Sequence, residues 1–231
     1  VNATNVADVI TLGYASATGS SDSGTINTSN VTVASLVSDS LDTITVNNTG
    51  TQRSTLTLFD AGDAETVTWN NTTASVGSNP GLTVTDDNDN VATTYNFTGS
   101  GTTTFTSAMS TALTTVNGSA ATGALDLNVS SNTNNLTLST GSGDDRVELG
   151  LLGTNFSSAT NDSVNLGDGT DTMVVTDTSF TAGDITLIKA VTSAEVIEFA
   201  STTAETTVDF NTVSVIDSFK FAGVITDAAG A

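Results

Sequence analysis

The fold of this chain is indicated most directly by residues 140–148 (TGSGDDRVE) and, further along, by residues 166–174 (LGDGTDTMV). Both stretches fit the pattern x-G-x-G-x-D-x-U-x, in which U is apolar. A tight turn presents carbonyl and carboxylate oxygens, and an alternating β-strand follows at once. This is the arrangement of calcium-binding nonapeptides, with Thr140 and Leu166 where the first Gly is usual. The two stretches therefore predict turn–strand units with a candidate ion site at the turns.

The candidate metal residues follow from the chemistry of such a turn. Gly lets the backbone enter conformations that a Cβ would obstruct, and Asp supplies the hard anionic oxygen that calcium prefers. A degraded third copy lies between the two good ones, since Asp162 precedes Asp171 by nine residues and Val164 occupies the apolar position. The predicted set is Gly141, Gly143, Asp144, Asp145, Asp162, Gly167, Asp168, Gly169 and Asp171. The alternative is that both loops are ordinary Gly-Asp turns, and the sequence leaves open whether Asp145 and Asp171 face one ion.

Outside these loops the chain also reads as β-structure. Thr and Val favour strands, whereas Asn, Asp, Gly and Ser favour the turns between them. Short alternating runs with one apolar face recur at 44–46, 56–58, 67–69, 82–84, 125–129, 136–138, 147–149 and 197–199. Their close spacing leaves little room for crossover helices. We therefore predict an all-β fold, a β-solenoid or β-roll-like structure or a β-sandwich, as a single continuous domain over residues 1–231 with calcium-binding turns at 140–175.

Two segments depart from the strand pattern. Residues 107–116 place apolar side chains at helical offsets before Gly118, which predicts one short helix. Residues 181–196 are compatible with a helical turn or a strand.

The charge balance excludes two classes of partner. Four basic residues face 25 acidic ones, for a formal net charge of -21. Nucleic acids and anionic membrane surfaces are bound through clustered Lys and Arg, so neither is an expected partner. Divalent cations are the expected means of offsetting the acidity, because the acidic residues lie mainly in turns with Gly, Asn and Ser.

The missing residue types restrict catalysis. The chain has no His and no Cys, which excludes Ser-His-Asp triads, His-ligated zinc and thiolate sites. Asp144 and Asp145 are the only conceivable acid–base pair, yet neighbouring side chains in extended backbone point to opposite faces. We therefore expect no enzymatic activity. No apolar run is long enough to span a bilayer.

A second acidic stretch, residues 86–90 (DDNDN), also alternates oxygen ligands. It lacks the Gly and Glu that a helix–loop–helix calcium site requires at its sixth and twelfth positions, so we interpret it as a solvated turn. Trp69, Tyr14 and Tyr95 are far apart in sequence and are predicted to pack in the core or at an edge.

The region from about Thr140 to Phe221 resembles the RTX-type calcium-binding repeats and adjoining β-solenoid of bacterial surface-layer (S-layer) proteins. The matching residues are Gly141, Gly143, Asp145, Gly167, Gly169 and Asp171. The resemblance implies that Ca²⁺ binds at these loops, that the chain leaves the cell by a type I secretion route, and that calcium drives folding and lattice assembly.

These observations lead to three function hypotheses. The first is a non-enzymatic, secreted structural protein of the bacterial cell surface that is stabilised by calcium and self-assembles into an S-layer lattice or filament. The second is a repeat module of a large secreted RTX adhesin that binds a surface partner, for which a cell-surface glycan is a candidate. The third is a piece of a secreted hydrolase whose catalytic domain lies elsewhere.

Overall fold

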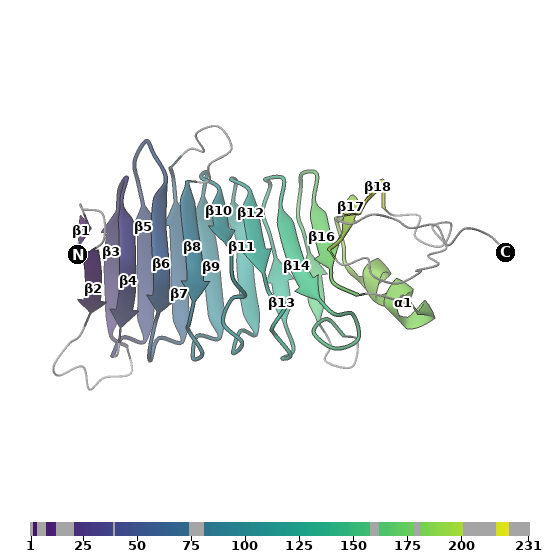
Figure 1. Ribbon diagram of the computed structural model, residues 1–231, viewed down its shortest axis with the longest axis horizontal. Helices are drawn as coiled ribbons and strands as arrows, with labels where there is room; N and C mark the ends of the chain where they lie inside the picture. The colour runs from purple at the N-terminus through teal and green to yellow at the C-terminus, as the bar shows by residue number, and fades with distance from the viewer. Residues whose placement is uncertain are drawn as a thin grey trace.

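The computed structural model describes residues 2–3, 8–12, 21–38, 40–73, 81–157, 162–177, 181–200 and 216–221. The protein is nearly all β, with 49% strand, and its parallel sheets form a β-solenoid of about seven turns (Figure 1). The predicted all-β solenoid is confirmed. Because each strand pairs in parallel with the equivalent strand of the next coil, the hairpin-built β-sandwich is not the architecture.

Successive strands alternate between two sheets, except that the last two strands both join the ten-stranded sheet. The eight-stranded sheet contains, in spatial order, β1 (Asn2–Ala3), β3 (Ser23–Thr28), β5 (Thr43–Asn48), β7 (Thr66–Asn71), β9 (Thr94–Gly99), β11 (Thr115–Ala121), β13 (Thr137–Ser139) and β15 (Ser163–Asn165). The ten-stranded sheet contains β2 (Asp8–Leu12), β4 (Thr32–Ser38), β6 (Ser54–Asp60), β8 (Leu82–Asp87), β10 (Thr103–Phe105), β12 (Leu125–Asn128), β14 (Arg146–Gly150), β16 (Thr172–Val175), β17 (Val196–Phe199) and β18 (Ser218–Phe221).

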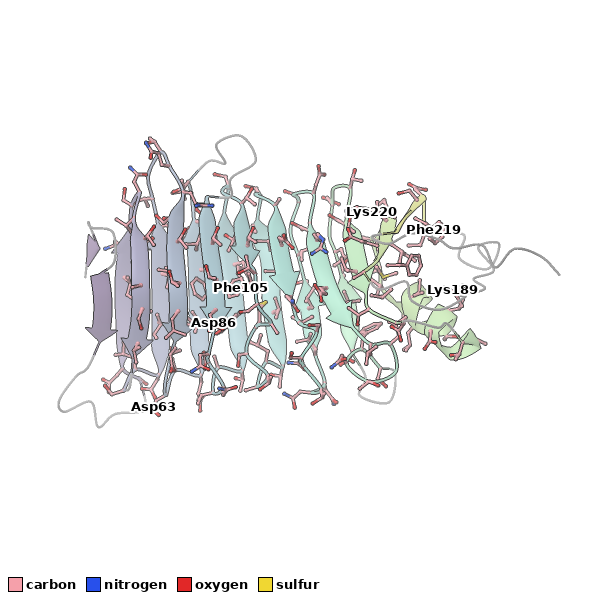
Figure 2. The ribbon with its side chains drawn as sticks, viewed as in Figure 1. Asp63, Asp86, Phe105, Lys189, Phe219 and Lys220 are labelled. Atoms are coloured by element: carbon pink, nitrogen blue, oxygen red, sulfur yellow. The ribbon has the colours of Figure 1, made fainter. Side chains whose placement is uncertain are left out.

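The two sheets are joined by two rows of turns. We call the turns that lead from the eight-stranded into the ten-stranded sheet the A corners, and the turns that lead back the B corners. Because all strands of a sheet run in the same direction, the A corners lie along one edge of the stack and the B corners along the other. Figure 2 labels Asp63, which lies in the B corner between β6 and β7 at the lower edge of the view.

The core fills the space between the sheets and is built by stacking equivalent residues. In β5, the side chains of Ile44, Val46 and Asn48 are buried, and the residues between them face outward. Ile44 pairs with Val67, and Val67 pairs with Tyr95, so each coil places its apolar residues directly over those of the coil before it. The two-residue period of a strand thus becomes a continuous apolar column along the solenoid.

Aromatic residues occupy the middle of this core. Trp69 is fully buried and makes edge-to-face contacts with Phe59 and Phe105, with ring centroids 4.7 and 5.3 Å apart. Tyr95, also fully buried, lies 5.9 Å from the Trp69 ring (Figure 2 labels Phe105). The predicted packing role of Trp69 and Tyr95 is confirmed, whereas Tyr14 lies outside the described residues. Such contacts contribute beyond the burial of the ring area.

A buried amide ladder closes the core at the A corners. The side chains of Thr28, Asn48 and Asn71 lie over one another in successive coils and have no exposed surface. Thr28 donates to Asn48 Oδ1 at 3.0 Å, and Asn48 Nδ2 donates to Asn71 Oδ1 at 2.9 Å and to the Gly81 carbonyl at 2.8 Å. The ladder supplies hydrogen bonds to buried polar groups with no exposed surface, where such bonds are needed to offset desolvation.

The helix predicted at 107–116 is wrong. Residues 107–114 form turns, and β11 begins at Thr115. Met109 and Leu113 are buried, and the Met109 amide donates to the Asn128 carbonyl of the next coil at 2.8 Å. The apolar spacing therefore reflects a corner that packs on its neighbour, because bonds between coils replace the bonds a helix would make within itself.

The second ambiguous segment does contain a helix, α1 (Ala182–Ala190). Thr181 caps its N-terminus: the Thr181 side chain accepts from the Asp184 amide, and the Asp184 carboxylate accepts from the Thr181 amide. This reciprocal capping box fixes the start of the helix. In the described part of the chain, no helix is long and apolar enough to cross a membrane.

Asn48 and Asn47 provide a matched test of the buried ladder. Asn48→Ala should lower the free energy of unfolding by about 2–3 kcal/mol, because it removes the acceptor of the buried Thr28 hydroxyl and one donor each to the Gly81 carbonyl and the Asn71 amide oxygen. Asn47→Ala, one residue earlier and facing outward, should cost less than about 1 kcal/mol. Chemical denaturation of both variants measures the difference. Equal losses would show that the ladder does not stabilise the coil stack.

Candidate metal centre

The two glycine-aspartate loops occupy neighbouring A corners. Residues 140–145 lead from β13 into β14, and residues 166–171 lead from β15 into β16. Because β14 and β16 pair directly, with Arg146 opposite Thr172, the two loops lie one over the other. The structure thus brings Asp145 and Asp171 together. Asp162 precedes β15 and lies in a B corner, so it does not join them.

The glycines of these loops allow the corners to stack closely. A Cβ on Gly167 would lie 2.0 Å from the Gly141 carbonyl oxygen, and a Cβ on Gly141 would lie 1.9 Å from the Ala121 carbonyl oxygen. The same corner is tied across the coils, since the Asp168 amide donates to the Gly141 carbonyl at 2.9 Å. These glycines are therefore explained by coil-to-coil contact alone, whether or not an ion is bound.

The aspartates also have a structural role that the sequence pattern does not reveal. Asp145 Oδ1 accepts from the Leu125 amide at 2.7 Å, and Asp171 Oδ1 accepts from the Asp145 amide at 2.8 Å. Glu195 continues the series, because its Oε2 accepts from the Asp171 amide at 2.8 Å. Each acceptor stands immediately before a strand and bonds the amide at the equivalent position of the preceding coil. We call these side chains the pre-strand carboxylates.

The B corners follow the same rule. Asp42 Oδ2 accepts from the Asp22 amide at 2.7 Å, and Asp162 Oδ1 accepts from the Leu136 amide at 2.7 Å. Both acceptors directly precede a strand, β5 and β15. Asp162 is thus assigned to backbone capping at its own corner. Glu195 and Asp42 were missed as members of one set by sequence reasoning, although an acidic residue immediately before an alternating run is a signal that would have found them.

Asp171 differs from the other pre-strand carboxylates. Its side chain has no exposed surface, and its Oδ2 has no hydrogen-bond partner among the described residues. Burial raises the pKa of Asp171 to about 7, and the negative charges of Asp145, Glu195 and Asp144 act in the same direction. A buried anionic oxygen of this kind is costly unless a proton or a cation neutralises it.

The remaining predicted ligands are arranged less favourably for an ion. Both oxygens of Asp145 already accept from amides, the second from Gly141 at 3.2 Å. Asp144 is exposed and accepts from the Thr170 amide at 2.9 Å, and Asp168, Gly169 and Thr170 are at the surface. In the described part of the chain, no three Asp or Glu side chains converge in a way that could hold a metal. A cation here would need backbone carbonyl oxygens for most of its ligands.

A second acidic cluster is buried at a B corner, where a solvated turn was predicted. Asp86, Asn88 and Asn90 are exposed as expected, but Asp87 and Asp89 are 9% and 1% exposed. The Tyr95 hydroxyl lies 3.0 Å from Asp87 Oδ2 and 3.2 Å from Asp89 Oδ2. The interpretation as a solvated turn is wrong for these two residues, because both bond the buried hydroxyl of Tyr95 on the strand that follows the corner.

Backbone amides satisfy the other oxygens of this cluster. Asp87 accepts from the amides of Asp89 and Ser110, and Asp89 accepts from those of Val91 and Ala92. Burial nevertheless raises the pKa of Asp87 to about 7 and also raises that of Asp89, and the charge of each neighbouring carboxylate adds to the effect. The cluster therefore holds a proton near neutral pH.

Comparison with protein-family models, with curated proteins and with solved structures finds no match to this chain. The assignment of the corners therefore depends on their geometry.

Alanine substitutions at Gly167 and Gly153 distinguish the stability cost of steric contact from the cost of a left-handed backbone conformation. Both have positive φ, 86° and 79°, but a Cβ on Gly153 meets nothing within 4 Å. Gly153→Ala should cost about 1–2 kcal/mol from the left-handed backbone alone. Gly167→Ala should cost about 1–3 kcal/mol more, because the Gly141 carbonyl must move. Equal costs in denaturant titrations would contradict close stacking at this corner.

Asp87 makes the stability of the protein depend on pH. Its folded-state pKa of about 7 lies above the ordinary value of 3.8, so the folded protein binds this proton more tightly than the unfolded chain. The resulting stabilisation is complete below about pH 4 and is lost as the pH rises through about 7. In the presence of a chelator, the Tm should therefore rise when the pH is lowered from 8 to 5.

Variants of adjacent residues provide the control. Asp87→Asn should reduce the rise in Tm, whereas Asp86→Asn, on the exposed neighbour, should leave it unchanged. In a chain of this size 1 kcal/mol corresponds to about 2–4 °C, so calorimetry resolves the effect. A Tm that falls between pH 8 and pH 5 in the wild type, or equal slopes in the two variants, would contradict this account.

Proposed function

We propose that this protein is a non-enzymatic, secreted structural protein of the bacterial cell surface that binds calcium at its A corners and assembles with copies of itself into an S-layer lattice or filament. The observation that carries the proposal is the buried Asp171 carboxylate, whose Oδ2 has no hydrogen-bond partner among the described residues. A divalent cation bound there would remove the cost of an unpaired buried charge. The repulsion between Asp171, Asp145 and Glu195 would fall at the same time.

The ion would be held by Asp171 together with backbone carbonyl oxygens of the two stacked turns, since calcium accepts six to eight oxygen ligands in a flexible geometry. When bound, it supplies positive charge that links neighbouring coils. At a free calcium concentration of about 10⁻³ M and a Kd of about 10⁻⁴ M, one site adds roughly 1.4 kcal/mol to the stability of the fold.

A structural role is also supported by how the pre-strand carboxylates are used. Asp145, Asp162 and Asp171 each accept a hydrogen bond from a backbone amide of the preceding coil. Carboxylates that are engaged in this way hold the stack together and are poorly placed to exchange protons with a substrate. The parallel sheets could be extended by strands of another copy, because an unpaired sheet edge bonds a further strand through its backbone.

Removal of Asp171 tests the calcium part of this proposal. In wild-type protein, millimolar calcium should raise the Tm above the value in chelator and should increase the particle size measured by light scattering. Asp171→Asn keeps an oxygen for the Asp145 amide but removes the charge, so it should lose most of the calcium-dependent rise. Asp86→Asn serves as the control, because Asp86 is an exposed carboxylate near the end of β8, away from the A corners. Identical Tm and particle size with calcium and with chelator would refute the proposal.

The second candidate function is a surface-binding module of a larger secreted adhesin. One observation favours it: the strands of the eight-stranded sheet contain no charged residue, although the chain as a whole has 25 acidic and four basic ones. A neutral, solvent-facing sheet on a polyanionic protein is a suitable binding surface, because a partner there meets no desolvated charge.

A further inference from the structure

The outward face of the eight-stranded sheet is a regular array of small polar side chains. Along its seven strands from β3 to β15, the outward residues of two rows are equivalent from coil to coil. The first row consists of Ser23, Thr43, Thr66, Thr94, Thr115, Thr137 and Ser163, and the second of Thr25, Thr45, Thr68, Asn96, Asn117, Ser139 and Asn165. All are half-buried or exposed. We call these two rows the threonine face.

The outward side of the ten-stranded sheet is less uniform: its row of Thr32, Thr55, Thr83 and Thr104 passes directly into the charged residues Asp126 and Arg146. This side carries an ion-pair network in which Arg146 contacts Asp126 at 3.2 Å and Glu198 at 3.1 Å. Lys220, labelled in Figure 2, contacts Glu198 at 2.5 Å. Charged side chains hold their own water and vary in size, so this side is neither neutral nor even.

The geometry of the threonine face is fixed in two directions. Neighbouring strands are about 4.8 Å apart, and alternate residues along a strand are about 7 Å apart. Six steps between seven strands give a length of about 29 Å. Figure 1 shows the strands of the stack side by side with little change of direction, although open sheets ordinarily twist. The result is a flat, two-dimensional array.

The side chains of this surface are also held in place. Threonine is β-branched and has few side-chain conformations in a strand. Beside the two rows, Asn47 Nδ2 donates to Asn27 Oδ1, Asn70 Nδ2 donates to Asn47 Oδ1, and Thr98 donates to Asn70 Oδ1, each at 3.1 Å. Ladders of this kind favour flat sheets and reduce the ordering cost of binding.

The charge and chemistry of the face select the ligand. A second copy would present the same uncharged array, so no charge complementarity favours the pairing of two such faces. Proteins usually bind crystalline polysaccharides through exposed aromatic rings. Trp69 and Tyr95 of this sheet instead point inward and are fully buried. A neutral array of hydroxyl, amide and methyl groups is complementary to a neutral lattice of water. The repeats of the array are close to those with which oxygen atoms recur on faces of ice.

We propose that the threonine face binds ice. This inference deepens the second candidate function, the surface-binding module, and does not depend on calcium binding or lattice assembly. Water molecules ordered by the regular hydroxyl and methyl groups would merge with the crystal. The free energies of the many weak contacts would add, because all of the side chains match the ice lattice at the same time.

The experiment measures thermal hysteresis of the full chain and its partition into growing ice, with calcium present. The wild type should separate the melting and freezing points and enter the ice. Thr68→Lys, in the centre of the face, should lose most of both activities because a long charged side chain prevents flat contact. Thr55→Lys should retain them, because Thr55 is equally half-buried but faces outward from the ten-stranded sheet. Should Thr68→Lys lose its β-sheet circular dichroism, Thr115→Lys tests the same face from another strand.

Several results would overturn the proposal. One is a folded wild type that shows no hysteresis and is excluded from ice; another is an equal loss in Thr55→Lys and Thr68→Lys. Sedimentation with crystalline cellulose or chitin without any effect on ice would assign the face to a polysaccharide. A dimer that Thr68→Lys dissociates, again without an effect on ice, would assign it to a second copy. If the chain assembles in calcium but does not bind ice, the ice-binding proposal is rejected and the proposed cell-surface function is not.

Discussion

The structure depends on one constraint, that each coil of the solenoid lies in register on the coil before it, so that equivalent residues of most paired strand positions meet. Backbone bonds between coils enforce this register along both sheets, and the corners must obey it as well. At the A corners it requires glycine where Gly167 passes over the Gly141 carbonyl. In the core it stacks Thr28, Asn48 and Asn71 into a buried ladder. On the outside it repeats Thr43, Thr66 and Thr94 as a row. One geometric rule thus creates the interior, the corners and a surface pattern.

The same rule has an electrostatic cost, because acidic residues that recur at equivalent positions are brought close together. The pre-strand carboxylates Asp145, Asp171 and Glu195 follow one another along the A corners, each bonding an amide of the preceding coil. The hydrogen bonds stabilise the charged form, but burial and mutual repulsion oppose it, and at Asp171 the opposing effects raise the pKa to about 7. Burial beside Asp89 and Tyr95 raises the pKa of Asp87 in the same way. A chain with this arrangement is expected to bind protons or cations tightly in its folded state.

Much of the fold could be predicted from the sequence, because alternation in runs such as 44–46 and 67–69 reports directly which side chains face the core. The turns at 140–145 and 166–171 were also located correctly, since glycine and aspartate have strong local preferences. What failed depends on tertiary contacts: Met109 in the segment with helical spacing bonds to Asn128 of the next coil, and Asp87 and Asp89 are buried against Tyr95 of the strand that follows their corner. Which acidic residues share a corner is likewise set by coil length. Asp162 is nine residues from Asp171 in sequence and lies at the other edge, whereas Asp145, 26 residues away, lies beside it.

The most direct measurement of this account is residue-resolved amide hydrogen exchange at the corners. The amides of Leu125, Leu136, Asp145 and Asp171 each donate to the side chain of the next coil, although they lie in turns or at the start of a strand. The account predicts that they exchange as slowly as amides inside the flanking strands and that Asp145→Ala exposes the Leu125 amide, together with the Gly141 amide that bonds the second oxygen. Exchange of these four amides at the rate of open loops, while the strands remain protected, would contradict the claim that carboxylates at the corners hold the coils in register.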